Sequence, residues 1–274
     1  MKHSPTFGIV QGRLTRSPSH KLQWFPQLQW KREFEIASNL GLDYIELIVE
    51  RRHNPRNPIW NQVGIEHIKN LTKQNKLTIH SLCNDYVIDH CISAGSQVLN
   101  QTTKLISIGK TFGLKKLVLP LFEESELTKS NYKEYKSLLM ELGDACLEND
   151  MILCLETILD GKHLLEIMID LRHKGIFCVF DTGNRIAHNH DIYRDMLLLR
   201  NYIRHVHIKD KNVDDENVLL GTGKVNFKRV FKSLSDIGYS GPYTFETTRG
   251  NNPVETAKYN LLFCKFFIND TIEN

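Results

Sequence analysis

Met151-Ile-Leu-Cys-Leu-Glu156 is apolar at every position except the last, which is a glutamate. An unbroken apolar run of this kind is typical of a strand that is buried on both faces, as in a parallel sheet covered by helices. Longer segments with helical periodicity flank it, at residues 129–149 and 161–174. The sequence here therefore predicts a parallel strand between two helices, with a carboxylate where the strand ends.

Apolar runs and helical segments alternate in this way along all 274 residues. The predicted strands are Thr6–Gln11, Tyr44–Ile48, Leu77–Cys83, Leu117–Phe122, Ile152–Thr157, Phe177–Asp181, Ile203–Ile208 and Pro242–Glu246. The predicted helices are residues 29–41, 61–75, 95–112, 129–149, 161–174, 189–201, 226–237 and 253–268. Parallel neighbours need long crossover connections, and successive strand ends lie roughly 34 residues apart, which is the rhythm of a barrel of eight strands and eight helices.

These units predict an α/β fold, a (β/α)8 TIM barrel whose eight parallel strands form a closed sheet. A doubly wound open sheet is the alternative, but the chain has no glycine-rich dinucleotide-binding loop. No linker rich in Ser, Gly or Pro divides the chain. We therefore expect one barrel domain over residues 1–274.

Composition and charge argue against several classes of protein. Hydrophobic residues make up 41% of the chain and charged residues 24%, as in ordinary globular proteins. A net charge of +3 is too small to predict a nucleic-acid partner, and no apolar run reaches the roughly 18 residues that suggest a membrane span. Without a cleavable signal or a Cys-x-x-Cys motif, we expect a cytoplasmic protein in which Cys146, Cys154 and Cys178 are buried thiols.

Three connections are expected on the C-terminal rim of the barrel, where loops build active sites. The connection from Gly12 to Leu28 is too long for an ordinary loop. The segments Asp89–Ala94 and Asn212–Asn217 belong to the same rim. Because rim loops decide the substrate in such barrels, the sequence leaves its identity open.

Four consecutive predicted strands end in a residue of the type that binds metals, namely Glu156, Asp181, His207 and Glu246. Each follows an apolar run, and a carboxylate in such a place is costly unless it is paired or coordinated. Neighbouring strand ends converge in a barrel, and three carboxylates with one imidazole suit Mn²⁺, Mg²⁺, Co²⁺ or Zn²⁺. Purely structural roles are the alternative: a helix cap for the aspartate, salt bridges for the glutamates, and an interior position for the histidine.

Several motifs lie at these strand ends. The most specific is His205-Val-His-Ile-Lys-Asp210 followed by Leu220-Gly-Thr-Gly-Lys-Val-Asn-Phe227, and it is accompanied by Tyr44-Ile-Glu46, Cys154-Leu-Glu156, Asp181-Thr-Gly-Asn184 and Phe245-Glu246. Together they resemble, over nearly the whole chain, the xylose-isomerase-like TIM barrels, which include sugar and sugar-phosphate isomerases and epimerases. The stretches Gly8-Ile-Val-Gln-Gly-Arg13-Leu and Ser81-Leu-Cys-Asn-Asp-Tyr86 resemble a branch linked to surface-polysaccharide biosynthesis.

The resemblance implies that Glu156, Asp181, His207 and Glu246 hold one divalent metal ion, which polarises a substrate carbonyl. One of the two glutamates would remove a proton from the adjacent carbon and leave a metal-stabilised enediolate. Return of the proton to the opposite face gives an epimer, and return to the neighbouring carbon gives an isomer. The expected activity is therefore that of a metal-dependent isomerase or epimerase of a sugar or sugar phosphate.

Further site residues are predicted around this centre. Lys209 shares a strand face with His207 and is expected to neutralise the enediolate. The candidate substrate-binding residues are Arg13, Glu46, His80, Asn184 and Arg249. Asn184 stands where many epimerases of the family have the histidine of an Asp-x-x-His motif, and an amide does not exchange a proton near neutral pH.

Other functions use the same framework. A dehydratase, that is a lyase acting on a related polyol or keto-sugar, would share the metal site and the proton abstraction. A catalytically degenerate sugar-binding barrel is a second alternative. An apurinic endonuclease is disfavoured because this chain lacks histidines at Asn184 and in Asp214–Asn217, where such enzymes bind further zinc ions. The expected partner is a small-molecule sugar, and a homo-oligomer is left open because barrels of this kind often pair.

Overall fold

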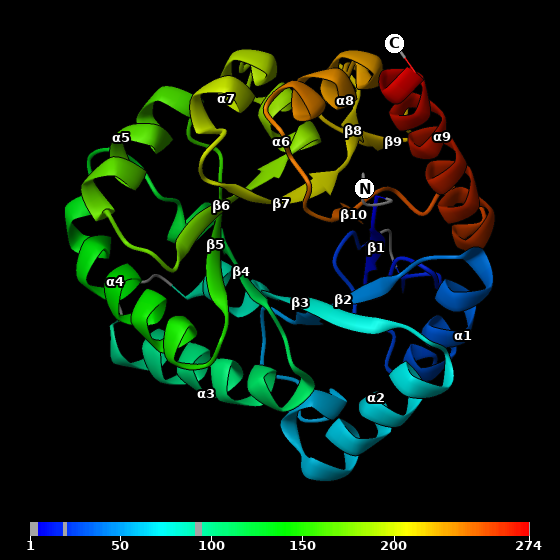
Figure 1. Cartoon of the computed structure of the whole chain (residues 1–274). Coiled ribbons are helices and arrows are strands. Elements are labelled where there is room, and N and C mark those ends of the chain that lie inside the picture. Colours follow the sequence, from blue (N-terminus) through cyan, green and yellow to red (C-terminus); the bar gives the residue numbers. More distant parts are fainter. Residues whose placement is uncertain (1–4, 19–20, 91–94, 274) are drawn as a thin grey trace.

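Eight parallel strands form a closed barrel in the order β1-β10-β7-β6-β5-β4-β3-β2. The structure is a computed structural model that describes residues 5–18, 21–90 and 95–273 (Figure 1). The barrel strands are β1 (Phe7–Val10), β2 (Tyr44–Val49), β3 (Thr78–Asn84), β4 (Lys116–Leu121), β5 (Ile152–Thr157), β6 (Ile176–Asp181), β7 (Ile203–Ile208) and β10 (Tyr243–Phe245). The predicted (β/α)8 barrel is confirmed.

Helices surround the barrel in Figure 1 and connect its strands. They are α1 (Trp30–Leu40), α2 (Gln62–Gln74), α3 (Ser96–Phe112), α4 (Tyr132–Glu148), α5 (Gly161–Leu171), α6 (Thr182–Ala187), α7 (Ile192–Leu199), α8 (Phe227–Asp236) and α9 (Pro253–Glu273). The prediction of one helix over residues 189–201 misses α6, which follows β6 directly. This short helix forms because Oδ1 of Asp181 accepts a hydrogen bond from the backbone N–H of Asn184 (2.6 Å).

Shorter elements decorate the loops, and the sequence analysis did not anticipate them. They are the 3-10 helices η2 (Pro58–Trp60), η3 (Asp85–Asp89) and η5 (Glu123–Ser125), and the two-stranded sheet of β8 (Asp210–Lys211) and β9 (Asn217–Val218). The rim segment Asn212–Asn217 connects β8 to β9 and supplies the first residue of β9. Of the predicted rim segment Asp89–Ala94, residues 91–94 lie outside the described residues.

The long connection after β1 is anchored by side chains from two other parts of the fold. Glu33 on α1 accepts hydrogen bonds from the backbone N–H groups of Gly12 (2.8 Å) and Leu14 (3.1 Å). Arg249, beyond β10, donates to the carbonyl oxygens of Gly12 (2.7 Å) and Lys21 (2.9 Å). Gly12 itself has a φ of +88°, and a Cβ there would collide with the backbone oxygen of Trp24. The described parts of this connection are therefore fixed against the rim.

The barrel interior is partly polar, whereas the layer between strands and helices is apolar. Tyr44, Glu46, His205 and Thr244 are completely buried and come from the inward faces of three strands. Cysteines also fill the core: Cys83, Cys146, Cys154, Cys178 and Cys264 are free and buried. Burial raises the pKa of the thiols of Cys146, Cys154 and Cys178 to about 12, as expected for unreactive core cysteines. Among the described residues, no helix is long and apolar enough to cross a membrane.

Candidate metal centre and substrate cavity

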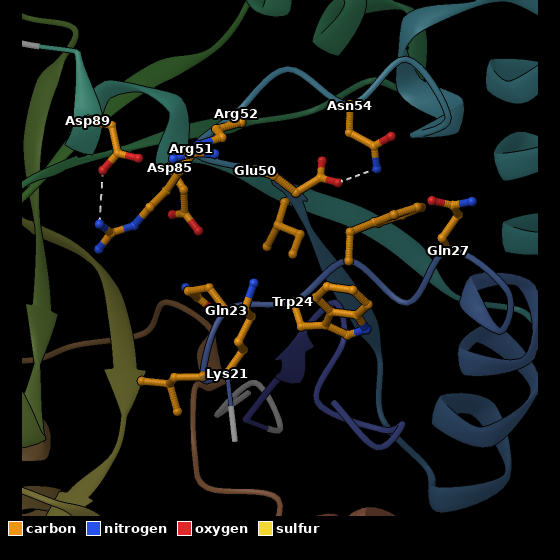
Figure 2. A pocket seen from close by; sticks show the side chains of 13 residues that line it. Lys21, Gln23, Trp24, Gln27, Glu50, Arg51, Arg52, Asn54, Asp85 and Asp89 are labelled. Atoms are coloured by element: carbon orange, nitrogen blue, oxygen red, sulfur yellow. Dashed lines mark hydrogen bonds and ion pairs between the residues drawn. The ribbon is translucent and has the colours of Figure 1, made fainter. Parts of the chain in front are cut away.

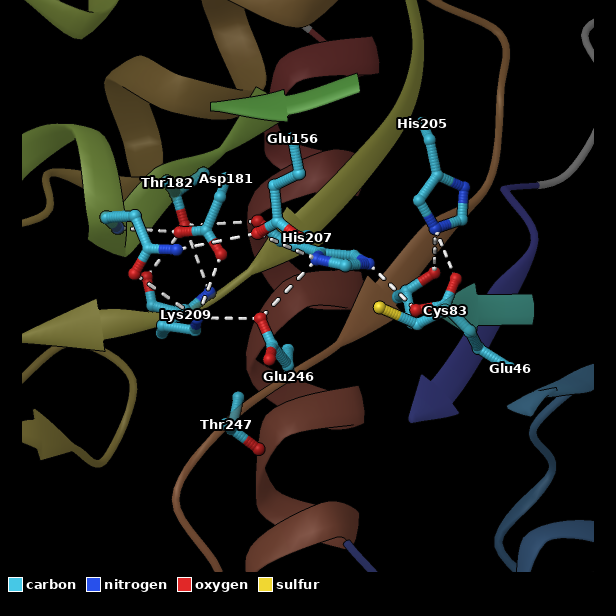
Figure 3. A network of polar contacts seen from close by, with 12 residues as sticks. Glu46, Cys83, Glu156, Asp181, Thr182, His205, His207, Lys209, Glu246 and Thr247 are labelled. Carbon is cyan, nitrogen blue, oxygen red and sulfur yellow. Dashed lines mark hydrogen bonds and ion pairs between the residues drawn. The ribbon is translucent and has the colours of Figure 1, made fainter. Parts of the chain in front are cut away.

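The four predicted ligands meet at the C-terminal rim of the barrel. Glu156 and Asp181 lie at the ends of β5 and β6, His207 lies near the end of β7, and Glu246 directly follows β10. Each is at most 5% exposed, and one ligand atom from each lies within 4.8 Å of the others. Figure 3 shows their side chains turned toward one another. We call these four residues the four-ligand cluster.

The cluster contains the donor atoms that a metal ion needs. Oδ2 of Asp181, Nδ1 of His207 and Oε2 of Glu246 are buried and make no well-directed hydrogen bond, although both carboxylate oxygens lie within ion-pair distance of Nζ of Lys209. Nδ1 of His207 lies 3.4 Å from both Oε1 of Glu156 and Oε2 of Glu246. Buried polar atoms are almost always satisfied, so three carboxylates and an unsatisfied imidazole nitrogen around one point indicate a missing cation. Carboxylate oxygens and one imidazole nitrogen fit a divalent cation such as Mn²⁺, Mg²⁺, Co²⁺ or Zn²⁺.

The aspartate of the cluster has two roles at once. Its Oδ1 caps α6, as the structural alternative predicted, while its Oδ2 faces the centre of the cluster. The cap therefore fixes the carboxylate in the orientation that a ligand needs. The helix cap and the ligand are compatible interpretations of the same residue.

Lys209 lies against the cluster. Its ammonium Nζ is 3.0 Å from Oδ2 of Asp181 and 2.6 Å from Oε2 of Glu246. Burial disfavours the charged amine, but the charges of Asp181 and Glu246 raise the pKa of Lys209 above its ordinary value. Thr182 fixes the backbone here, because its hydroxyl donates to the carbonyl of Lys209 at 2.7 Å. The lysine is thus a permanently charged group at the edge of the centre.

The two glutamates of the cluster have unlike surroundings. Burial raises the pKa of Glu156, and the charges of Glu246 and Asp181 raise it further while His207 opposes them. Burial also acts to raise the pKa of Glu246, but Lys209 and His207 hold it well below the ordinary value. The two carboxyl groups therefore differ in proton affinity.

Glu46 lies behind His207 in the barrel interior and is completely buried. Its Oε1 is 2.9 Å from Nε2 of His207, and its Oε2 is 2.7 Å from Nε2 of His205. Burial raises the pKa of this carboxyl, but the two imidazoles more than offset that and lower it. The sequence analysis places Glu46 among the substrate-binding residues, whereas its contacts here are with two imidazoles, one of them the predicted ligand His207.

Arg13 and Asn184 join the cluster from its sides. A guanidinium nitrogen of Arg13 lies 3.3 Å from Oε1 of Glu246. The amide of Asn184 donates to Oε1 of Glu156 at 3.4 Å and accepts from Nζ of Lys209 at 3.3 Å. The sequence analysis missed Gln23, which donates to Oε1 of Glu246 at 2.9 Å and accepts from Arg13 at 2.8 Å. No strand end marks Gln23, because it lies within the long first loop.

Two other predicted substrate-binding residues lie away from the cluster. His80 occupies the N-terminal half of β3, where its ring lies between those of Tyr44 (5.1 Å) and His205 (6.5 Å). Burial lowers the pKa of His80 to about 4, so it is a neutral interior histidine. Arg249 contacts the backbone of the first loop, as described above, and acts as an anchor there.

A cavity of about 690 Å³ opens beside the centre (Figure 2). Gln23 connects the two, because it lines the cavity and donates to Glu246. The other lining residues come from the first loop, the end of β2, the loop that follows β2, and η3; they are Lys21, Leu22, Trp24, Phe25, Gln27, Ile48, Glu50, Arg51, Arg52, Asn54, Asp85 and Asp89. The sequence analysis did not single out Asp85, because the strand before it, Thr78–Asn84, contains polar residues and ends in Asn84.

Comparison with known proteins agrees with this architecture. The xylose isomerase-like TIM barrel family model matches residues 34–266. L-ribulose-5-phosphate 3-epimerase UlaE of Shigella flexneri serotype 5b is 23% identical over 232 residues, covering 79% of this chain and 81% of the relative. The structure of an L-ribulose 3-epimerase superposes with a TM-score of 0.79 at 17% identity, covering 98% of this chain and 96% of that one.

A further similar structure contains a metal ion. It is a xylose isomerase-like TIM barrel protein from Mycobacterium smegmatis in complex with magnesium, with a TM-score of 0.73, 17% identity and 97% coverage of each chain. At such identities, structural similarity establishes the fold alone. The family match, however, extends over most of the chain and includes all four ligands. This chain therefore belongs to the xylose isomerase-like TIM barrel family.

Proposed function

We propose that this protein is a divalent-metal-dependent epimerase or isomerase of a small sugar. The observation that carries the proposal is the four-ligand cluster, in which three buried carboxylates and an imidazole nitrogen without a hydrogen bond converge on one point. The similarity to L-ribulose-5-phosphate 3-epimerase and L-ribulose 3-epimerase supports a keto-sugar as the substrate. An ion bound by the cluster would polarise the substrate carbonyl and so acidify the proton on the adjacent carbon.

Glu156 and Glu246 would move that proton. They come from strands on either side of β6 and β7, and their carboxyl groups have unlike proton affinities. Such a difference suits a pair in which one carboxylate takes a proton and one carboxylic acid returns it. Return to the opposite face of the same carbon would give the epimer, and return to the neighbouring carbon would give the aldose or ketose isomer.

Lys209 and Arg13 would stabilise the negative charge that develops on the substrate oxygens. Both are almost completely buried, and both lie within 3.3 Å of Glu246. Fixed charges in a site shielded from water stabilise a developing oxyanion more strongly than solvent does. Asn184 would hydrogen-bond a substrate hydroxyl without exchanging a proton, because its amide does not titrate.

Metal content is the first test. The purified protein is analysed by elemental mass spectrometry before and after chelation, together with Glu156→Ala and His207→Ala. We expect about one equivalent of Mn, Mg, Co or Zn in the wild type and a sharp loss in both variants. Glu166→Ala serves as the control, because Glu166 is exposed and pairs with Lys129 on the outside of the barrel. A wild type that remains free of metal after reloading would overturn the proposal.

Exchange of the proton with solvent tests the chemistry. Metal-loaded protein is incubated in deuterated water with L-ribulose and with its 5-phosphate, and deuterium at the carbon next to the carbonyl is followed by NMR. We expect incorporation by the wild type and its loss in Glu246→Gln, with the fold intact by circular dichroism. Release of a dehydrated product would assign the lyase alternative instead. If the protein binds metal but exchanges no proton on any sugar, the alternative of a catalytically degenerate sugar-binding barrel would hold.

A further inference from the structure

We propose that Asp85 makes the cavity beside the metal centre a subsite for the hydroxyl groups of an uncharged sugar chain. The proposal rests on the proposed function and adds the substrate class: a free keto-sugar rather than a sugar phosphate. Three observations carry it, namely the state of the Asp85 carboxylate, the position of the cavity, and the pairing of the charged groups that line it.

The Asp85 carboxylate is buried but incompletely satisfied. The residue is 2% exposed, and its Oδ1 accepts a weak hydrogen bond from Sγ of Cys83 at 3.2 Å. Its Oδ2 is buried and has no hydrogen-bond partner. Burial, together with the charges of Glu246 and Glu156, raises the pKa of Asp85 to about 7. A buried carboxyl oxygen without a partner indicates that a ligand completes its hydrogen bonding.

The orientation of Asp85 identifies where such a ligand would lie. Asp85 begins η3, directly after β3, and lines the cavity opposite Trp24 and Gln23 (Figure 2). Gln23 also donates to Oε1 of Glu246, so one side chain joins the wall of the cavity to the four-ligand cluster. A sugar with its carbonyl at the cluster would extend its remaining carbons toward Asp85. Trp24 offers an apolar face along this path, of the kind that commonly lines ligand pockets.

Three cationic side chains line the cavity, those of Lys21, Arg51 and Arg52, and among the described residues Arg51 alone of the three is paired with carboxylates. Arg51 forms ion pairs with Asp89 (3.0 Å) and with Glu123. The ammonium of Lys21 lies 5.8 Å from the centre of the Trp24 ring. Among the described residues, none forms an ion pair with Asp85.

This distribution of charge selects against an anionic ligand at Asp85. A phosphate beside an unpaired buried carboxylate would bring two negative charges together in a site of low dielectric constant. A sugar hydroxyl instead donates to an ionised carboxylate, or exchanges donor and acceptor roles with a protonated one. Neutral hydroxyl groups are thus the chemistry that Asp85 accepts in either protonation state.

Calorimetric titration of the metal-loaded protein tests the subsite without requiring turnover. The probes are L-ribulose and L-ribulose 5-phosphate, and the variants are Asp85→Asn, which keeps the shape, and Asp85→Ala. Asp144→Asn is the control, because Asp144 is an exposed aspartate on α4 that does not line the cavity and contacts His173. Circular dichroism and metal content establish that each variant is folded and loaded.

We expect the wild type to bind L-ribulose at least tenfold more tightly than the 5-phosphate. Asp85→Ala should weaken L-ribulose binding by about 10- to 100-fold, a typical effect of losing a hydrogen bond to a charged group. Asp144→Asn should stay within about twofold of the wild type. Unchanged binding in both Asp85 variants, tighter wild-type binding of the phosphate, or no wild-type binding of L-ribulose would overturn the subsite. Binding that depends on Asp85 without deuterium exchange would instead overturn the proposed function and leave the subsite intact.

Discussion

His207 is held between Glu46 and the metal centre by its two ring nitrogens. Nε2 lies 2.9 Å from Oε1 of Glu46, and Nδ1 faces Glu156 and Glu246 at 3.4 Å. An ionised carboxylate is an acceptor only, so Glu46 favours the tautomer with the hydrogen on Nε2. The lone pair of Nδ1 is then free to bind a metal ion, which makes Glu46 a positioning residue for the ligand.

Glu46→Gln should weaken metal binding by about 10- to 100-fold while the barrel stays folded, as is typical when a partner of a ligating histidine is lost. The amide keeps the size of the side chain but removes the charge that fixes the His207 tautomer. The measurement is a competitive metal titration of the chelated protein. Glu66→Gln is the control, since Glu66 lies on the exposed face of α2. A dissociation constant unchanged by Glu46→Gln would show that the contact does not position His207.

Lys209→Met should lower the rate of deuterium exchange by about 100- to 1,000-fold, as is typical when a group that stabilises an oxyanion is removed. It should leave metal content within about twofold of the wild type, because three carboxylates and the imidazole remain. Lys211→Met is the control, since the Lys211 ammonium pairs with Asp215 outside the cluster. If Lys209→Met lost metal content and deuterium exchange to the same extent, Lys209 would be needed to hold the metal site together and not for the proton transfer.

The stability of the protein should fall with rising pH in part because of Glu33. Burial raises its pKa to about 7, against three hydrogen bonds from Gly12, Leu14 and Thr15 that lower it. The folded state therefore holds this proton more tightly than the unfolded chain does. The resulting stabilisation is complete below the unfolded pKa of about 4.5 and is lost as pH rises through about 7.

Urea unfolding at pH 5.5 and pH 8.0 measures this effect. The wild type should lose about 2 kcal/mol more unfolding free energy over this interval than Glu33→Gln, whose amide does not titrate. Comparing two slopes removes the contributions of other titrating groups, such as Asp85. Parallel slopes for the two proteins would mean that Glu33 keeps an ordinary pKa in the folded state.

Asp195→Ala should lower the unfolding free energy by about 3–5 kcal/mol, because it leaves a buried charge unpaired. Oδ2 of Asp195 lies 2.9 Å from a guanidinium nitrogen of Arg185, and both side chains are at least 93% buried. The guanidinium also lies 4.8 Å from the centre of the Phe180 ring, within the shell of helices. Asp236→Ala, which removes an exposed partner of Lys232, should cost about 0.5 kcal/mol or less. Similar losses of unfolding free energy in the two variants would contradict a stabilising buried ion pair between Asp195 and Arg185.

The strands and the four-ligand cluster could be predicted because both follow from short-range patterns. An apolar run such as Met151–Leu155 marks a buried strand, and the polar residue after it marks the rim. Parallel connectivity then brings the ends of neighbouring strands together without further information. Glu156, Asp181, His207 and Glu246 meet for this reason.

Contacts that depend on loops or on strand stagger could not be predicted in the same way. Gln23 reaches Glu246 only because the first loop folds back over the rim, and no periodicity marks it. The position of Glu46 between His205 and His207 depends on how far the strands are shifted relative to one another. Helix α6 was missed because six residues are too few to show helical periodicity.

The His205–Asp210 motif lies at the site, as predicted, but its last residue has a structural role. Asp210, at the end of the His205–Asp210 motif, accepts hydrogen bonds from the backbone N–H groups of Gly221 (3.0 Å), Gly223 (2.9 Å) and Val225 (3.1 Å). The glycine-rich motif is thus tied to the strand that carries His207 and Lys209. Its glycines allow close approach: a Cβ on Gly223 would collide with Asp210.

The cavity and the four-ligand cluster come from different halves of the chain. The cavity is lined by residues between 21 and 89, whereas the cluster lies between 156 and 246. The cavity wall and the metal ligands are therefore encoded by separate stretches of the gene, and Arg13, Gln23 and Glu46 are residues of the first half of the chain that contact the ligands. A chimera joined within α3 that keeps Arg13, Gln23 and Glu46 would exchange the rest of the cavity while the metal centre stays the same.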